Sequence, residues 1–107
     1  MDRSFDAIFK ALADPGRRRL LDALRDDDGE TLSQMSEHLE MSRQAVSQHL
    51  AILENANLVT VVWRGREKFH YLNPVPLFDV GERWIRTFEH SRLWALDNLK
   101  RKLEDPS

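Results

Sequence analysis

Four polar residues between positions 43 and 48 have the side chains that read base edges in a DNA major groove. Gln44 and Gln48 lie one helical turn apart, and a glutamine amide can make two hydrogen bonds to adenine. Arg43 can pair with guanine in the same two-bonded way, and Ser47 is short enough to let a helix approach the bases. We predict that Arg43, Gln44, Ser47 and Gln48 read bases.

A second group of residues suits the DNA backbone. Arg64, Arg66 and Lys68 surround a glycine in a short segment, where a flexible basic loop can reach phosphates or the adjacent minor groove. Ser42 stands at the start of the helix predicted to read bases, and a helix N-terminus favours a phosphate. We predict that Ser42, Arg64, Arg66 and Lys68 hold the DNA backbone.

Helices must position the reading residues, and the apolar spacing predicts four of them before residue 57. The first covers about 4–13, and the second begins at Asp14-Pro15, a good cap followed by a good first helical residue. Thr31 and Gln34 form a capping-box pattern that opens a third helix through Leu39. The fourth is capped by Ser42 and ends near 55–57. Residues predicted to face the core are Leu20, Leu21, Leu24, Val46, Leu50 and Leu53.

The segment after the fourth helix predicts a β-hairpin and then a long helix. Residues 58–63 and 68–72 are rich in β-branched and aromatic side chains, and the four residues 64–67 between them contain a glycine. A helical stripe runs from about 76 to 104. The fold class is therefore mostly α: a winged helix-turn-helix (about 31–56), a two-stranded hairpin wing (about 58–72) and a long C-terminal helix, within one domain of 1–107.

Length and composition limit the classes of function that the chain can have. The 107 residues, 41% of them apolar, suffice for one core, and no segment is apolar enough to span a membrane. The start lacks a signal-peptide pattern, so we expect a cytoplasmic protein with no membrane partner. The net charge of −2 hides a gradient: residues 22–40 carry seven acids against one base, whereas 41–72 carry four bases against two acids. An anionic partner is expected at 41–72.

Three blocks of sequence carry a resemblance: Phe9 to Pro15 with Arg17 to Leu21; Met41 to Leu50, continuing to Leu53 and Leu58-Val59; and Arg64 to Arg66 with Tyr71 to Pro74. The chain resembles the ArsR/SmtB-type winged-helix transcriptional regulators over almost its whole length. The resemblance implies a homodimeric regulator of transcription, usually a repressor, that binds double-stranded DNA at a short inverted repeat. It also implies pairing through the first and last helices, and the predicted interface residues are Phe5, Ile8, Phe9, Trp84, Phe88, Leu96 and Leu99.

The chain departs from that family's pattern in two turns and in its metal ligands. Gly16 stands where threonine is usual, and Glu40 occupies a turn position where glycine or asparagine is common. There is no cysteine, and the last helix has a single histidine, His90, without the repeated spacing of a shared zinc site. We therefore expect the metal-independent branch of the family, with no metal and no cofactor. The sequence does not tell whether a small-molecule effector exists.

Alternatives remain for the function and for some residues. A winged-helix module that binds protein is the main rival, whereas an enzyme is not expected because no catalytic set can be assembled. His49 is predicted to be a packed, hydrogen-bonded helix residue rather than a base reader. Arginines 17–19 open a helix, where the helix dipole disfavours cations, and their compensating anion is either a phosphate or the nearby acidic residues.

Overall fold

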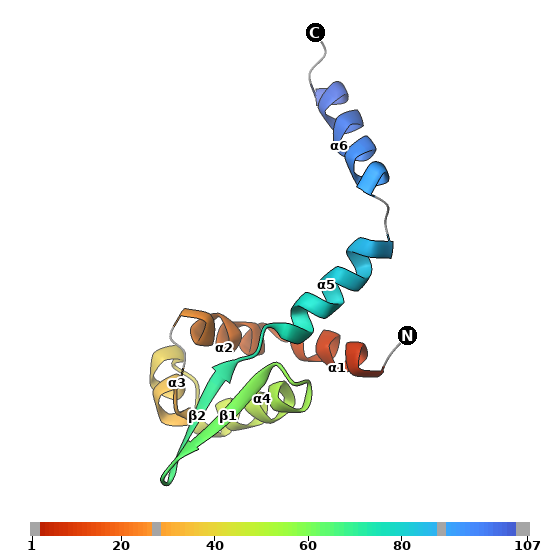
Figure 1. Cartoon of the computed structure of the whole chain (residues 1–107). Coiled ribbons are helices and arrows are strands. Elements are labelled where there is room, and N and C mark those ends of the chain that lie inside the picture. Colours follow the sequence, from red (N-terminus) through yellow and green to blue (C-terminus); the bar gives the residue numbers. More distant parts are fainter. Residues whose placement is uncertain (1–2, 27–28, 88–89, 105–107) are drawn as a thin grey trace. The chain divides into compact units, whose positions relative to one another are not determined.

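The helices and strands follow the predicted order with small changes at their ends. The computed structural model describes residues 3–26, 29–87 and 90–104. Contacts divide the chain into two units, Met1–Leu77 and Phe78–Ser107, which are described separately. The elements are α1 (Arg3–Leu12), α2 (Pro15–Asp26), α3 (Leu32–Leu39), α4 (Arg43–Asn55), β1 (Val59–Arg64), β2 (Glu67–Leu72), α5 (Val75–Thr87) and α6 (His90–Glu104) (Figure 1).

The helix starts are set by the predicted caps. Asp14 accepts a hydrogen bond from the Arg17 N–H at 3.0 Å, so α2 begins at the following proline. Thr31 and Gln34 form the complete capping box, with N–H to oxygen distances of 2.8 and 3.2 Å. The Ser42 hydroxyl accepts from the Ala45 N–H at 3.1 Å. These three predictions are confirmed.

The run of three arginines at the start of α2 caps other helices, which the sequence analysis did not foresee. Arg17 donates to the Ala11 and Lys10 carbonyls at 2.8 and 3.1 Å, and Arg18 donates to Leu12 at 2.6 Å. These carbonyls belong to the last three residues of α1, where an α-helix lacks its own donors, although the Lys10 carbonyl also accepts from the Ala13 N–H at 3.2 Å. Arg19 donates to the Leu39 carbonyl at the end of α3, at 2.9 Å. The negative ends of two helices therefore compensate these cations, and the charge of Arg17 also interacts with the Asp14 carboxylate, one of the nearby acidic residues that were predicted.

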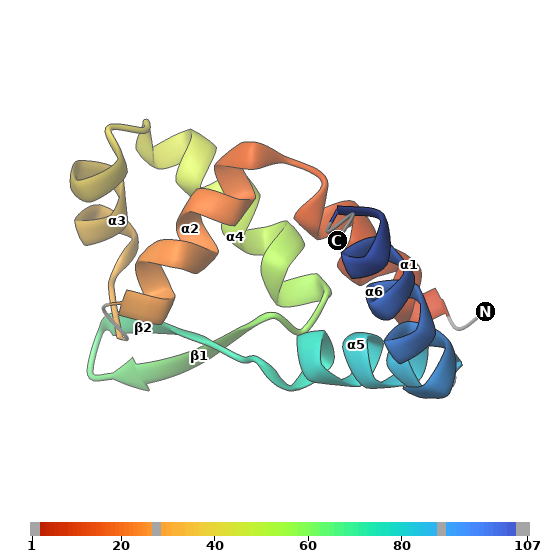
Figure 2. The same ribbon diagram turned by 90° about the horizontal axis from the view of Figure 1, so that it is seen from above.

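The core lies where α2, α3 and α4 meet the base of the hairpin. All six side chains predicted to face inward are buried, and α2 and α3 contact β2 while α4 contacts β1. Figure 2 shows the hairpin running along one side of these three helices. The largest fully buried side chains are Leu20, Leu24, Met35, Val46, Leu53 and Leu58. Burial of this kind contributes about 1.5–3 kcal/mol for each large aliphatic side chain.

The hairpin turn is tighter than predicted. The strands pair antiparallel from Val59 opposite Leu72 to Arg64 opposite Glu67, so only Gly65 and Arg66 form the turn instead of four residues. Gly65 has a φ of 64°, which a glycine adopts without strain. A two-residue turn with glycine at its first central position matches the twist of the two strands, and this is why the pairing extends to the turn.

The C-terminal region, predicted as one helix over about 76–104, is helical in two segments. Helix α5 ends at Thr87 and α6 begins at His90. Both helices carry large exposed apolar residues, namely Phe78 and Ile85 on α5 and Leu96, Leu99 and Leu103 on α6. None of the helices in the described part of the chain has the length and apolar character needed to cross a membrane.

Glu40 stores strain at the end of α3, and removing it should stabilise the fold. Glu40 is a C-cap with φ 52° and ψ 42°, a left-handed conformation that costs a non-glycine residue about 1–2 kcal/mol. Glu40→Gly relieves that cost but raises the conformational entropy of the unfolded chain. We therefore expect a net gain of about 0.5–1 kcal/mol in the free energy of urea unfolding. Glu37→Gly, at an exposed position inside α3, is the control and should destabilise by about 1 kcal/mol. Destabilisation by both variants would show that Glu40 carries no strain.

Candidate nucleic-acid interface

The predicted base-reading residues share the exposed face of α4. Arg43, Gln44, Ser47 and Gln48 are all exposed, whereas Val46, Leu50 and Leu53 on the other side of the helix are buried. The helical period that turns the apolar residues inward therefore turns the polar ones outward. Ser42 is exposed at the N-terminus of the same helix, where its oxygen serves as the cap. The result is a short polar helix face with an accessible N-terminus.

His49 belongs to α4 but not to this face. Its Nε2 atom lies 3.8 Å from Oδ2 of Asp14, the cap of α2, so the ring is packed as predicted but is not hydrogen-bonded there. The Arg17 N–H bonded to the Asp14 carboxylate holds the pKa of that group below its ordinary value. A Cβ on Gly16 would come within 2.9 Å of both Asp14 Oδ2 and His49 Nε2. A side chain at position 16 would therefore require the Asp14 carboxylate and the His49 ring to shift.

The basic residues of the hairpin are divided between its two faces. Antiparallel pairing places Trp63 opposite Lys68 on one face, and Arg64 shares the other face with Phe69 and Tyr71. The Arg64 guanidinium lies 5.3 Å from the centre of the Phe69 ring, and its Nη2 donates to the Tyr71 hydroxyl at 3.2 Å. Arg64 is thus held against the hairpin on the face away from Lys68.

Lys68 and Arg66 differ in their surroundings. The Lys68 ammonium lies 3.4 Å from Oε1 of Glu54 on α4 and 5.9 Å from the centre of the Trp63 ring. Arg66 is exposed in the turn, and within the residues that the structure describes it makes neither an ion pair nor a side-chain hydrogen bond. Of the three hairpin residues predicted to contact the DNA backbone, Arg66 is the one whose charged group interacts least with its own chain.

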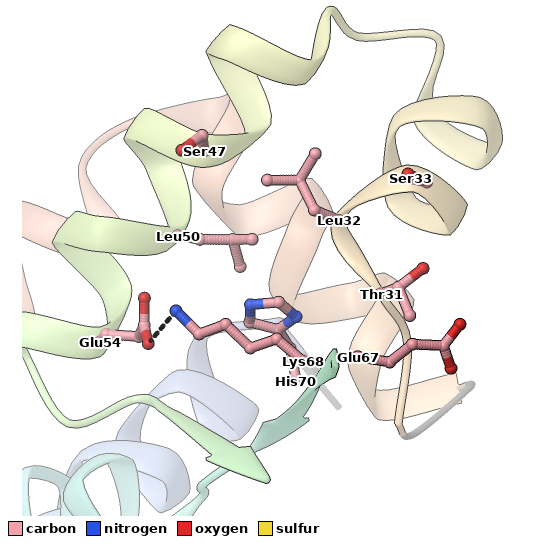
Figure 3. Close-up of a pocket in the computed structure, with 9 residues that line it drawn as sticks. All are labelled: Thr31, Leu32, Ser33, Ser47, Leu50, Glu54, Glu67, Lys68 and His70. Atoms are coloured by element: carbon pink, nitrogen blue, oxygen red, sulfur yellow. Dashed lines mark ion pairs between the residues drawn. The ribbon is translucent and has the colours of Figure 1, made fainter. Parts of the chain in front are cut away.

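An open groove of about 450 Å³ separates the start of α3 from α4 and β2. Figure 3 shows Lys68 reaching from the hairpin across this groove toward Glu54, with Ser47 on the helix beyond. Because Ser47 also belongs to the polar face of α4, the groove connects that face to the hairpin. The groove is lined by Thr31, Leu32, Ser33, Ser47, Leu50, Glu54, Glu67, Lys68 and His70.

A buried polar pair, Glu30 and His70, joins the hairpin to the start of α3. His70 N–H donates to the Glu30 carbonyl at 2.8 Å, and the Glu30 and Gly29 N–H groups donate to the His70 carbonyl at 3.2 and 3.1 Å. The His70 ring Nδ1 lies 3.0 Å from the same Glu30 carbonyl, and a second contact of 2.7 Å joins the Glu30 carboxylate to His38 Nδ1. The sequence alone did not identify this pair. The alternation of the strand, which turns position 70 inward with 68 and 72, was the available signal.

The residues predicted for the dimer interface differ in how exposed their side chains are. Ile8 is buried within its own chain, Phe5 is half-buried and Phe9 is exposed. Leu96 and Leu99 are exposed on α6. Phe88 and the Trp84 side chain lie outside the described residues. Among the groups that the structure does describe, no three His, Asp or Glu side chains are placed to hold a metal ion.

A capped two-helix motif with a polar second helix and an adjoining antiparallel hairpin defines a winged helix-turn-helix protein. Residues 14–61 match the family model described as "Bacterial regulatory protein, arsR family". The chain belongs to this family of transcriptional regulators. It is 37% identical to the uncharacterized HTH-type transcriptional regulator YuzN of Bacillus subtilis (strain 168) over 91 residues, covering 79% of this chain and 99% of the relative.

Two further comparisons agree with that assignment. The transcriptional repressor SdpR of Bacillus subtilis (strain 168) is 35% identical over 81 residues, which are 76% of this chain and 88% of SdpR. An ArsR-like transcriptional regulator from Rhodococcus sp. RHA1 has the same fold, with a TM-score of 0.74 and 26% identity over 94% of this chain and 92% of that one. The relatives are regulators of transcription and not enzymes.

Burial of His70 should make stability depend on pH. Burial lowers the pKa of His70 below its ordinary value of 6.5. Below pH 6.5 the unfolded chain therefore takes up a proton that the folded chain resists, and the free energy of unfolding falls as the pH falls. In urea titrations from pH 7.5 to 5.5, His70→Gln should lose stability at every pH but show a shallower decline than wild type. Parallel curves would contradict this account.

Proposed function

We propose that this protein is a homodimer that binds double-stranded DNA sequence-specifically at a short inverted repeat and represses transcription. The observation that carries the proposal is the outward polar face of α4, where both glutamines are exposed opposite a buried apolar face. Uncharged amides next to an open helix N-terminus suit base edges in the major groove. The repressor activity of SdpR, a relative by sequence, supports repression as the outcome.

Each group of residues has its own role in the proposal. Arg43, Gln44, Ser47 and Gln48 read bases, and Ser42, Arg64, Arg66 and Lys68 contact the backbone. Arg66 carries most of the hairpin's charge interaction, because Arg64 and Lys68 already have partners on their own chain. No metal or cofactor takes part, in keeping with the absence of cysteine from the sequence. The protein works in the cytoplasm, where its DNA target is found.

The first helix, α1, where Phe9 is exposed, and the C-terminal helices supply the proposed dimer contact. Leu96, Leu99 and Leu103 are 65%, 54% and 76% exposed and lie at spacings of three and four, on one side of α6. Phe78 and Ile85 are exposed seven residues apart on α5. Large apolar faces of this kind are covered by a partner in stable proteins, and a two-fold dimer requires a two-fold DNA site.

Binding of another protein is the alternative function. The net charge of −2 and the acidic segment 22–40 favour it over a nucleic-acid partner. The position of the charge argues against it, because the exposed face of α4 and the hairpin turn carry Arg43 and Arg66 rather than acidic residues. Selection of duplexes from a random pool by the purified protein tests both functions. An enriched inverted repeat supports the DNA reading, whereas no enrichment favours a protein partner.

Loss of a reading amide should reduce affinity only for the selected duplex. Gln44→Ala or Gln48→Ala should cost about 1–3 kcal/mol on that duplex and little on random DNA, because each amide is matched to particular bases. Asn55→Ala removes an exposed amide at the far end of α4 and is the control. Titrations on both duplexes measure the difference. Equal losses on both, or none, would mean that α4 does not read the sequence.

Breaking the apolar face of α6 should separate the subunits. Leu99→Glu places a charge in the proposed contact, so we expect a monomer at micromolar concentration in light scattering, together with weaker binding to the selected duplex. Arg101→Gln changes the charge by the same amount on the opposite side of α6, where Arg101 pairs with Asp97, and should leave the dimer intact. A Leu99→Glu protein that remains dimeric would contradict the proposed interface.

A further inference from the structure

Trp63 is a large aromatic side chain that the core does not use. It is 63% exposed near the end of β1, two residues before the first residue of the hairpin turn, Gly65. Its neighbour Val62 is 41% exposed but lies on the opposite face of the same strand, since successive side chains of a strand alternate. Val62 and Trp63 are therefore adjacent in the sequence but lie on opposite faces of the hairpin.

Strand pairing shows which face Trp63 occupies. Trp63 lies opposite Lys68, and two residues further along the strands Val61 lies opposite His70. His70 is buried beside Glu30 at the start of α3, so the face shared by these residues is the one turned toward the helices. Trp63 continues this face beyond the core, toward the turn.

The surroundings of the indole connect it to the proposed reading face. The Lys68 ammonium is 5.9 Å from the centre of the Trp63 ring and 3.4 Å from Glu54 of α4, and Lys68 lines the same groove as Ser47. On the other side of Trp63 the chain continues into the turn with Arg66. The indole thus lies beside Lys68, a lining residue of the groove whose opposite wall is α4.

We propose that Trp63 is a DNA-contacting residue of the hairpin, and that its indole packs against the sugars or base edges of the minor groove beside the site read by α4. This inference rests on the proposed function. The apolar ring suits deoxyribose, and the indole N–H is a donor for the N3 and O2 acceptors of the minor groove. Charge complementarity favours DNA as the occupant, since the Lys68 ammonium lies beside the ring and the exposed Arg66 follows in the turn, three residues after Trp63.

The contact of Trp63 should differ from that of its basic neighbours in its response to salt. An apolar contact releases no counterion, so Trp63→Ala should weaken binding about tenfold while leaving the slope of log affinity against log salt unchanged. Arg66→Ala should lower that slope by about one for each subunit. Trp63→Phe keeps an aromatic ring and should recover part of the affinity. Val62→Ala is the matched control on the opposite face and should bind as wild type does.

A second readout measures the contact directly. Acrylamide quenching of the full-length protein is compared with that of Trp63→Phe, so that the difference reports on Trp63 among the three tryptophans. Saturation with the selected duplex should protect this component from the quencher. A component that stays accessible in the saturated complex would overturn the proposal, whatever the affinity of the variants.

The outcomes separate this inference from the proposed function. If wild type binds its selected duplex and Trp63→Ala binds equally well, the indole contact is disproved and the function stands. If Val62→Ala loses as much affinity as Trp63→Ala, the loss comes from the hairpin as a whole and the inference fails. If wild type prefers no duplex, the proposed function itself fails. Protection of Trp63 by a protein rather than by DNA would assign the surface to a protein partner.

Discussion

The backbone bridge between Glu30 and His70 is the constraint on which the proposed DNA surface depends. Two main-chain hydrogen bonds and a ring contact join these buried residues, which are forty positions apart, and the Gly29 N–H donates a third main-chain bond to the His70 carbonyl. Once His70 is fixed beside the start of α3, the alternation of β2 turns Lys68 toward α4 and Phe69 away from it. A shift of one residue would exchange these faces. The bridge thereby sets which hairpin side chains stand beside the reading helix.

Contacts at the helix ends are the second interaction that holds the helices in place. The three arginines of α2 bind the C-terminal carbonyls of α1 and α3, and Asp14 at the cap of α2 lies against His49 of α4. Helices α1, α3 and α4 are therefore all connected through α2 and its cap. Hydrogen bonds from charged donors are worth about 1.5–3 kcal/mol each, more than neutral ones, although exposure of Arg18 and Arg19 reduces their share. The capping of neighbours by one helix also explains how a small core can hold four helices in place.

The features that could be predicted from the sequence are those determined by nearby residues. Caps such as Thr31 and Ser42 act within three residues, and the apolar spacing of α4 determines which of its residues point outward. The partners of Arg17, Arg64 and His70 could not be predicted, because each depends on how separate elements come together. The tight turn at Gly65 was also missed, since four polar residues between two strands do not reveal how far the pairing extends. The exposed face of α4 could be predicted from local periodicity. The partners of the side chains on each face of the hairpin could not be predicted in this way.

These contacts bear on how a chain with a net charge of −2 can bind DNA. Two of the three hairpin cations are engaged within the chain, Arg64 with Phe69 and Tyr71 and Lys68 with Glu54. The attraction of the hairpin for phosphates is weakened accordingly, and non-specific affinity depends mainly on such attraction. The neutral amides of Gln44 and Gln48 on α4 are exposed and keep their capacity for contact. A surface with few available charges and several neutral contacts favours discrimination between sequences over general affinity, because random DNA satisfies the charges but not the shape or the amides.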